Sequence, residues 1–333
     1  MSANGNPSII TENQNWLIDE LLGHKKEFIS DFLLENGSRY GYSSYNKEQL
    51  KEKILESLQE GSFTVNDLIN LLDKIEEFGR QHIYLYQYNV NLINDLKDQS
   101  FIREQLSEKG IEHVLNSSES LLFPEKPTLV SVNHNSDYLK FKWILINEYH
   151  KYLREERTNS HIIKYYKVIK TRDIRSFRID LNTGWADLMI KKLHRGSKYR
   201  FIEGQILQEI NPFIDIRNLT PVKVKRAIKP LNESSEVRIR KEKMQTLGGC
   251  HIEFTSPGRG SDLRDEASVR THRNNLGRTS SSSFGNYYWY PTAQLEQETH
   301  VTVYGDDNRV GIHRQCYEKE VDYVLSRIRA LAE

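Results

Sequence analysis

Residues 161–205 constrain the fold most, because their side chains alternate in the manner of β-strands. Residues 176–180 read SFRID, in which apolar and charged side chains follow one another with a period of two. The Asn-Thr-Gly sequence at 182–184 is typical of a tight turn, and a second apolar run follows it. The pattern predicts successive strands, and therefore a β-sheet in the C-terminal half of the chain.

The N-terminal third has the different spacing of amphipathic helices. Thr64 is a good N-cap, Asp67 occupies the third helical position, and an apolar stripe runs from Val65 to Phe78. We predict an α+β protein in which an all-α N-terminal domain precedes a mostly antiparallel sheet with a C-terminal helix packed on it. The expected divisions are a flexible N-terminus at 1–10, a helical domain at 11–116, a linker at 117–127, and a β-rich domain at 128–333 with a long flexible loop at 256–284.

Charge is divided unequally between these halves. The first 120 residues hold 20 acidic and 11 basic side chains, whereas residues 161–244 hold 20 basic and 9 acidic ones. The whole chain has a net charge of only +1. The helical domain is therefore acidic and the sheet domain basic, which favours an anionic ligand for the sheet.

Composition limits the class of protein. The hydrophobic fraction of 37% is enough for a folded core, and the two cysteines are too few for a disulfide framework. The N-terminal residues do not have the pattern of a secretory signal, and no apolar run is long enough for a membrane span. We therefore expect a cytoplasmic protein, with a composition that suits a bacterium.

Basic side chains interleaved with tyrosines suggest contacts to nucleic acid, in which cations bind phosphates and rings stack on bases. A second basic group begins at Val222, where the alternation predicts a strand with Lys223 and Lys225 on one face. The same charges also suit docking against the acidic domain, or a solvated surface. The candidate contact residues are Lys164, Lys167, Lys170, Arg172, Arg175, Arg178, Lys191, Lys192, Arg195, Lys198, Arg200, Lys223, Lys225, Arg226 and Lys229.

A metal-dependent nuclease is the catalytic alternative. Such enzymes hold Mg²⁺ or Mn²⁺ on carboxylates that project from adjacent strands. Asp187 and Glu203 have roughly this layout if residues 201–205 form a strand, and Gln205 stands where a catalytic lysine is expected. The chain contains no phosphate-binding glycine loop, nucleophile elbow or His-Glu-x-x-His sequence. Outside the nuclease alternative, the sequence predicts no cofactor and no metal.

An aromatic run near residue 290 is a candidate docking site for a protein, with Tyr288 and Trp289 as the contact residues. Alternate rings of one strand are also a common source of core side chains. These features lead to the hypothesis of a non-catalytic adaptor. Its basic sheet would bind nucleic acid, which we expect to be double-stranded DNA, and its acidic helices would bind a protein partner or a second copy. A subunit of a protein-only assembly, such as a bacterial defence complex, is a further alternative.

Overall fold

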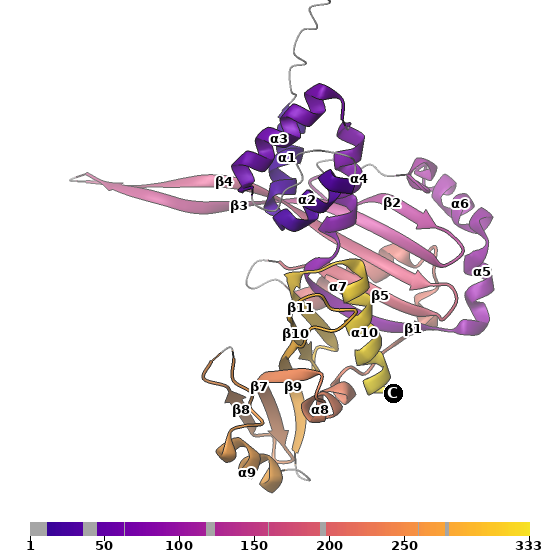
Figure 1. Cartoon of the computed structure of the whole chain (residues 1–333). Helices are drawn as coiled ribbons and strands as arrows, with labels where there is room; N and C mark the ends of the chain where they lie inside the picture. Colours follow the sequence, from indigo (N-terminus) through magenta and orange to yellow (C-terminus); the bar gives the residue numbers. More distant parts are fainter. Residues whose placement is uncertain are drawn as a thin grey trace, which may run out of the picture. The chain divides into compact units, whose positions relative to one another are not determined.

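A computed structural model describes residues 12–35, 45–62, 64–117, 124–158, 160–193, 198–258, 260–276 and 280–333 (Figure 1). It confirms the predicted fold class: helices at the N-terminal end, extensive antiparallel sheet and a closing helix. The chain forms two compact units. The terminal unit comprises residues 1–81, 223–306 and 310–333, and the middle unit comprises residues 82–222 and 307–309.

Four helices begin the terminal unit: α1 (Glu12–Gly23), α2 (Lys26–Glu35), α3 (Lys47–Glu60) and α4 (Val65–Glu76). Local signals determine two of their starts. Asn46 and Gln49 form a reciprocal capping box at α3, and Thr64 and Asp67 form another at α4. Gly61 ends α3 in the left-handed conformation that glycine adopts most readily.

The sheet of the terminal unit has the strand order β11-β10-β9-β7-β8. Its strands are β7 (Val237–Thr246), β8 (His251–Thr255), β9 (Ser280–Trp289), β10 (Thr299–Tyr304) and β11 (Arg309–Gln315). Three further helices accompany them: α8 (Lys225–Glu233), α9 (Ala267–Leu276) and α10 (Glu318–Ala332).

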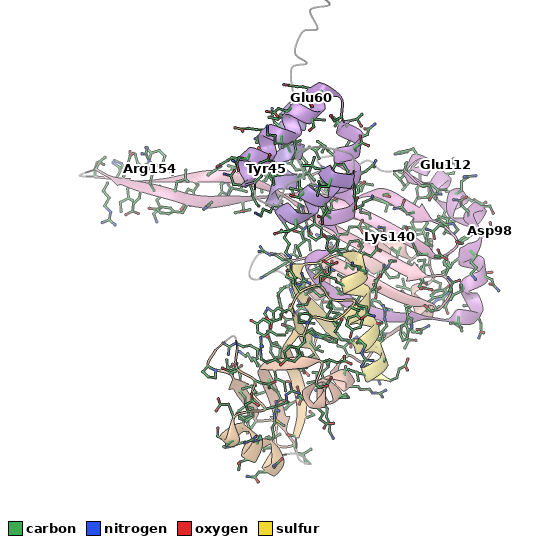
Figure 2. The ribbon with its side chains drawn as sticks, in the orientation of Figure 1. Tyr45, Glu60, Asp98, Glu112, Lys140 and Arg154 are labelled. Carbon is green, nitrogen blue, oxygen red and sulfur yellow. The ribbon has the colours of Figure 1, made fainter. Side chains whose placement is uncertain are left out.

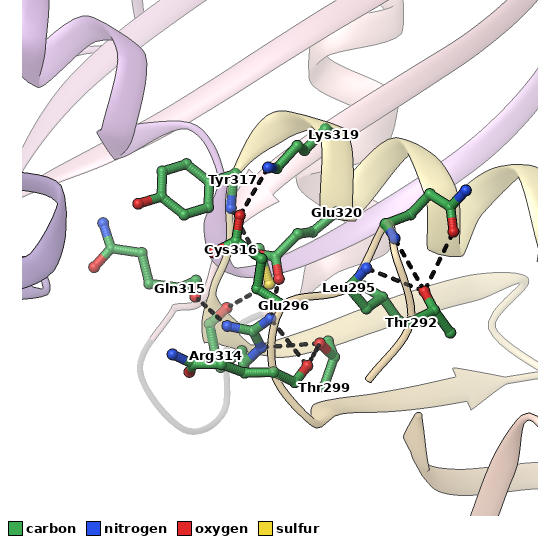
Figure 3. A network of polar contacts seen from close by, with 12 residues as sticks. Thr292, Leu295, Glu296, Thr299, Arg314, Gln315, Cys316, Tyr317, Lys319 and Glu320 are labelled. Carbon is green, nitrogen blue, oxygen red and sulfur yellow. Dashed lines mark hydrogen bonds and ion pairs between the residues drawn. The ribbon is translucent and has the colours of Figure 1, made fainter. Parts of the chain in front are cut away.

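Helix α10 is joined to the sheet by a polar network at its first turn. Arg314 on β11 donates from Nε to Thr299 Oγ1 at 2.9 Å and forms an ion pair with Glu320 of α10 (Figure 3). The other carboxylate oxygen of Glu320 accepts the backbone N–H of Tyr317 at 2.9 Å and so caps the helix. On the apolar side, the ring of Tyr323 packs edge-on against Trp289.

Two predictions in the terminal unit are corrected. Residues 222–228, expected as a strand, lead into helix α8, because Val224, Ala227, Ile228 and Leu231 are buried with helical spacing. Residues 256–284, expected as a flexible loop, contain α9 and the start of β9, whose serines pair with β7 along the backbone. Residues 259 and 277–279 of this stretch lie outside the described part.

The middle unit has the strand order β2-β3-β4-β5-β1, with β6 paired to β1. The strands are β1 (Gly79–Tyr88), β2 (Thr128–His134), β3 (Tyr138–Arg157), β4 (Ile162–Asp180), β5 (Trp185–Lys191) and β6 (Leu219–Pro221). Its helical segments are η1 (Val90–Leu92), α5 (Ile93–Lys97), α6 (Gln99–Glu108), η2 (Glu112–Val114), α7 (Tyr199–Ile210) and η3 (Ile216–Asn218). A single apolar core joins α5, α6 and α7 to one face of the sheet.

The compact units do not divide at the predicted linker, residues 117–127. Residues 79–88 form strand β1 inside the segment that was expected to be all helical. Its run of aromatic and β-branched side chains suits a strand buried on both faces. No helix in the described residues is long and apolar enough to cross a bilayer.

Candidate nucleic-acid interface

A long hairpin formed by β3 and β4 extends beyond the other strands of the middle unit (Figure 1). Strand β2 pairs with β3 only as far as Ile144, and β5 pairs with β4 only from Arg175 onward. Residues 148–170 past these points, here called the hairpin arm, therefore pair only with each other among the described residues. The charged sequence of residues 149–159 suits a helix or a long connection, but residues 149–157 continue β3 instead.

The arm remains a ribbon because its sequence strongly favours strands. Residues 162–169 read IIKYYKVI, in which every position that is not lysine is aromatic or β-branched. At the tip, the N–H of Thr158 donates to the carbonyl of His161 at 2.9 Å and closes the turn. Most side chains of the arm are exposed, so they are available to a ligand.

Cross-strand pairing divides the arm into two faces, because directly opposite residues project to the same side. The register shifts after Tyr152, and this bulge moves Arg154 onto the same face as Tyr165. The lysine face carries Tyr149, Lys151, Arg154, Glu156, Ile163, Tyr165, Lys167 and Ile169. The aromatic face carries Glu148, His150, Tyr152, Glu155, Arg157, Ile162, Lys164, Tyr166, Val168 and Lys170.

Two lysines stand directly opposite each other on the lysine face. Lys151 pairs in register with Lys167, and neither forms an ion pair within the described part of the chain. Beside them the guanidinium carbon of Arg154 lies 4.8 Å from the ring centroid of Tyr165 (Figure 2 labels Arg154). Glu156 binds Arg154 at 3.0 Å and accepts the Tyr165 hydroxyl at 2.9 Å. Like charges directly opposite each other destabilise a ribbon. An anion bound between the two lysines would reduce this repulsion.

Only some of the predicted cations lie on the hairpin arm. Lys164, Lys167 and Lys170 lie on the arm, whereas Arg172, Arg175 and Arg178 are buried or half-buried in the body of the sheet. There Arg175 binds Asp173 at 2.8 Å and Arg178 binds Asp187 at 3.1 Å. The sheet leaves these three arginines little exposed surface for a ligand, and carboxylates pair with two of them.

The remaining predicted cations lie elsewhere. Lys191 ends β5, Lys192 follows it, and Lys198 and Arg200 lie at the start of α7. Arg195 lies outside the described residues. The group Lys223, Lys225, Arg226 and Lys229 belongs to the terminal unit, where Lys225 binds Asp306 at 2.9 Å. The arm also contributes Lys151, Arg154 and Arg157, which were not among the predicted contact residues because the charged sequence of residues 149–159 suits a helix or a long connection.

The predicted carboxylate pair does not form a shared site. Glu203 and Gln205 lie on helix α7 rather than on a strand. That helix packs on the face of the sheet formed by Ala186 and Leu188, whereas Asp187, one residue along β5, projects to the opposite face. No group of three His, Cys, Asp or Glu side chains suited to a metal occurs in the portion of the chain that is described.

Glu203 has a structural role that predicts a pH effect. Its carboxylate accepts the Tyr86 hydroxyl at 2.5 Å, and its burial raises its pKa, an effect that this hydrogen bond opposes only in part. The protonated side chain of Glu203 therefore stabilises the folded state at pH values below the ordinary glutamate pKa of 4.5. This stabilisation is lost as the pH rises through the higher pKa that Glu203 has in the folded state.

Glu203→Gln keeps an acceptor for Tyr86 and removes the buried charge. We expect the variant to have a higher urea midpoint than the wild type near pH 7, with the difference shrinking toward about pH 4. Urea unfolding followed by circular dichroism at several pH values measures this. A difference that is the same at every pH would contradict the raised pKa.

The predicted protein-docking residues are not a surface pair. Trp289 is fully buried in the core of the terminal unit and offers no surface to a partner in this structure. The period of two along β9 explains this, because it turns Tyr287 and Trp289 inward. Tyr288 is half-buried, with its ring stacked on His300 at a centroid distance of 4.8 Å.

Comparison with known proteins adds no family to this description. No protein-family model matches the chain, and a search of curated protein sequences finds no significant relative.

Proposed function

We propose that this chain is a non-catalytic binding protein whose hairpin arm contacts the backbone of duplex nucleic acid. The duplex that we expect is double-stranded DNA. The observation that carries the proposal is the opposed pair Lys151 and Lys167 on an exposed ribbon. These two ammonium groups form no ion pair with any described residue and stand side by side, an arrangement that suits contacts to the phosphates of a nucleic-acid strand. The neighbouring Arg154 and Tyr165 add a guanidinium and a ring to the same surface.

The dimensions of the arm fit this ligand. Each of its strands spans about ten residues, or roughly 33 Å at the usual rise of a β-strand. This is close to one turn of B-form DNA, whose major groove admits a two-stranded ribbon. Because the cations repeat along the arm and most of its polar groups are charged, the contacts favour phosphates over particular bases.

The N-terminal helices supply the second part of the proposal. Helices α1 to α4 carry 13 acidic and five basic side chains, a net charge of −8. Such a surface suits a basic protein partner and repels nucleic acid. The nuclease alternative has no comparable support, because Asp187 projects from one face of the sheet and Glu203 lies on helix α7, which packs on the other face.

Reversing the lysine pair tests the proposal. We expect Lys151→Glu together with Lys167→Glu to weaken duplex binding by about 100-fold at low salt, since two phosphate contacts are lost and repulsion replaces them. The slope of log affinity against log salt should fall by about two, one for each contact. Fluorescence anisotropy with a labelled duplex, measured between about 50 and 200 mM salt, gives both quantities.

A matched control separates a local contact from net charge. Lys97→Glu with Lys126→Glu changes the charge equally at two exposed positions of the middle unit that lie outside the arm. This control should retain nearly full affinity. Equal losses in both variants, or a wild-type chain that ignores duplex at low salt, would refute the proposal and favour a protein-only assembly.

A further inference from the structure

Exposed apolar side chains concentrate on the hairpin arm. Of the 13 large apolar residues that are exposed in the described part of the chain, seven lie between positions 152 and 168. They are Tyr152, Leu153, Ile162, Ile163, Tyr165, Tyr166 and Val168. A two-stranded ribbon is only marginally stable alone, and clustered apolar surface of this kind usually marks a binding site.

The aromatic face has the layout of a protein interface. At its centre the rings of Tyr152 and Tyr166 lie edge-on with centroids 6.0 Å apart, and each side chain is about half exposed. His150 packs against Tyr166 from the next rung, at 6.4 Å. Ion pairs close both ends, with Lys170 and Glu148 at 2.9 Å toward the body. Toward the tip, Arg157 and Glu155 lie at 2.8 Å. An apolar centre with a polar rim is typical of protein–protein contacts.

The charges of this face disfavour nucleic acid as its occupant. Its two carboxylates, Glu148 and Glu155, would face phosphates, whereas the lysine face on the other side holds a single acid, Glu156. The lysine face holds three cations and one acid, whereas the aromatic face holds three cations and two acids, and both of those acids form ion pairs on that face. The lysine face therefore suits an anion better than the aromatic face does. Different ligands are expected on the two sides.

The aromatic face is complementary to itself. A two-fold axis through its centre would stack the tyrosines of two arms and bring the base of each arm against the tip of the other. Arg157 near the tip of one arm would then approach Glu148 at the base of the second arm, and Lys164 would approach His150. The half-exposed side chains offer roughly 500–700 Å² for each arm, somewhat less than the ~800 Å² of a standard interface.

We propose that the aromatic face of the hairpin arm packs on the same face of a second copy of this chain, forming a two-fold dimer that leaves both lysine faces outward. This goes beyond the proposed function, because dimerisation is measured without nucleic acid. The small area predicts a weak dimer, with a dissociation constant on the order of 10 µM.

Sedimentation velocity of the full chain tests the dimer. We expect wild type to shift from monomer to dimer between about 1 and 100 µM. Tyr152→Thr with Tyr166→Thr should stay monomeric over the same range, since threonine keeps strand propensity and removes the rings. Tyr165→Thr, the same change on the lysine face, should dimerise like wild type.

Hydrogen exchange of the unmodified chain gives a second, mutation-free measurement. Peptides from residues 148–170 should become more protected as concentration rises, while peptides from the rest of the middle unit stay unchanged. A wild type that is monomeric throughout overturns the proposal, as does equal weakening by Tyr165→Thr. Protection that appears only when single-stranded DNA is added would assign the face to bases and also overturn it.

Discussion

Glu242→Ala is expected to destabilise the terminal unit by about 3–5 kcal/mol, the cost of removing one partner of a buried ion pair. The Glu242 side chain, on β7, is almost fully buried. One carboxylate oxygen accepts Nε of Arg273 from α9 at 2.8 Å. The other accepts Asn232 at 2.5 Å and Ser282 at 2.7 Å. The substitution would leave the guanidinium and an amide without their acceptor.

A neighbouring glutamate provides the control for this prediction. Glu253 on β8 binds Lys241 and Lys243 at 2.5 and 3.0 Å, but all three side chains are partly exposed. Glu253→Ala should therefore cost no more than about 1 kcal/mol. Replacing both Glu242 and Arg273 by apolar residues of similar size should cost less than Glu242→Ala alone. Chemical unfolding of the three variants measures these differences, and equal costs for Glu242→Ala and Glu253→Ala would contradict the buried network.

Excising the hairpin arm is expected to abolish both activities proposed for it while leaving the rest of the chain folded. Glu148 and Lys170 are directly opposite in register and form an ion pair at 2.9 Å. Residues 149–169 can therefore be replaced by Asn-Gly, which joins opposite residues through a two-residue type I′ turn. We expect duplex affinity to fall by at least about 100-fold and the dimer to disappear.

The excised chain should unfold at nearly the same denaturant concentration as wild type, because the removed side chains are mostly exposed. Anisotropy, sedimentation and unfolding measured on one preparation test the three expectations separately. Duplex binding that survives excision would assign phosphate contacts to other cations, such as those of α8. Loss of folding would show that the arm also stabilises the body of the sheet.

Local signals in the sequence predict several elements well. The capping residues Asn46 and Thr64 determine where α3 and α4 begin, and the period-two pattern of residues 176–180 corresponds to the inner part of β4. These features depend on hydrogen bonds and side-chain directions within a few residues. They can therefore be predicted without knowing what the elements pack against.

Short segments were mispredicted where two patterns fit equally well. Residues 222–228 alternate in polarity as a strand would, yet their apolar side chains also have helical spacing, and packing selected the helix. The residues after 149 are charged enough to suit a helix, and pairing with the strongly strand-forming 162–169 makes them a strand. In the first case the packing partners are distant in sequence, and in the second the partner strand lies across a hairpin turn. Neither partner can be identified from the segment's own pattern.

The amino-acid sequence by itself determined the class of fold, the division between acidic and basic halves, and the presence of a cationic stretch near residue 165. Only the tertiary structure decided which cations are available to a ligand. It pairs Arg175 and Arg178 with buried carboxylates, sets Lys151 opposite Lys167, and puts Asp187 and Glu203 on different faces of one sheet. The physical reason is that burial and register depend on which strands become neighbours, whereas composition and charge do not.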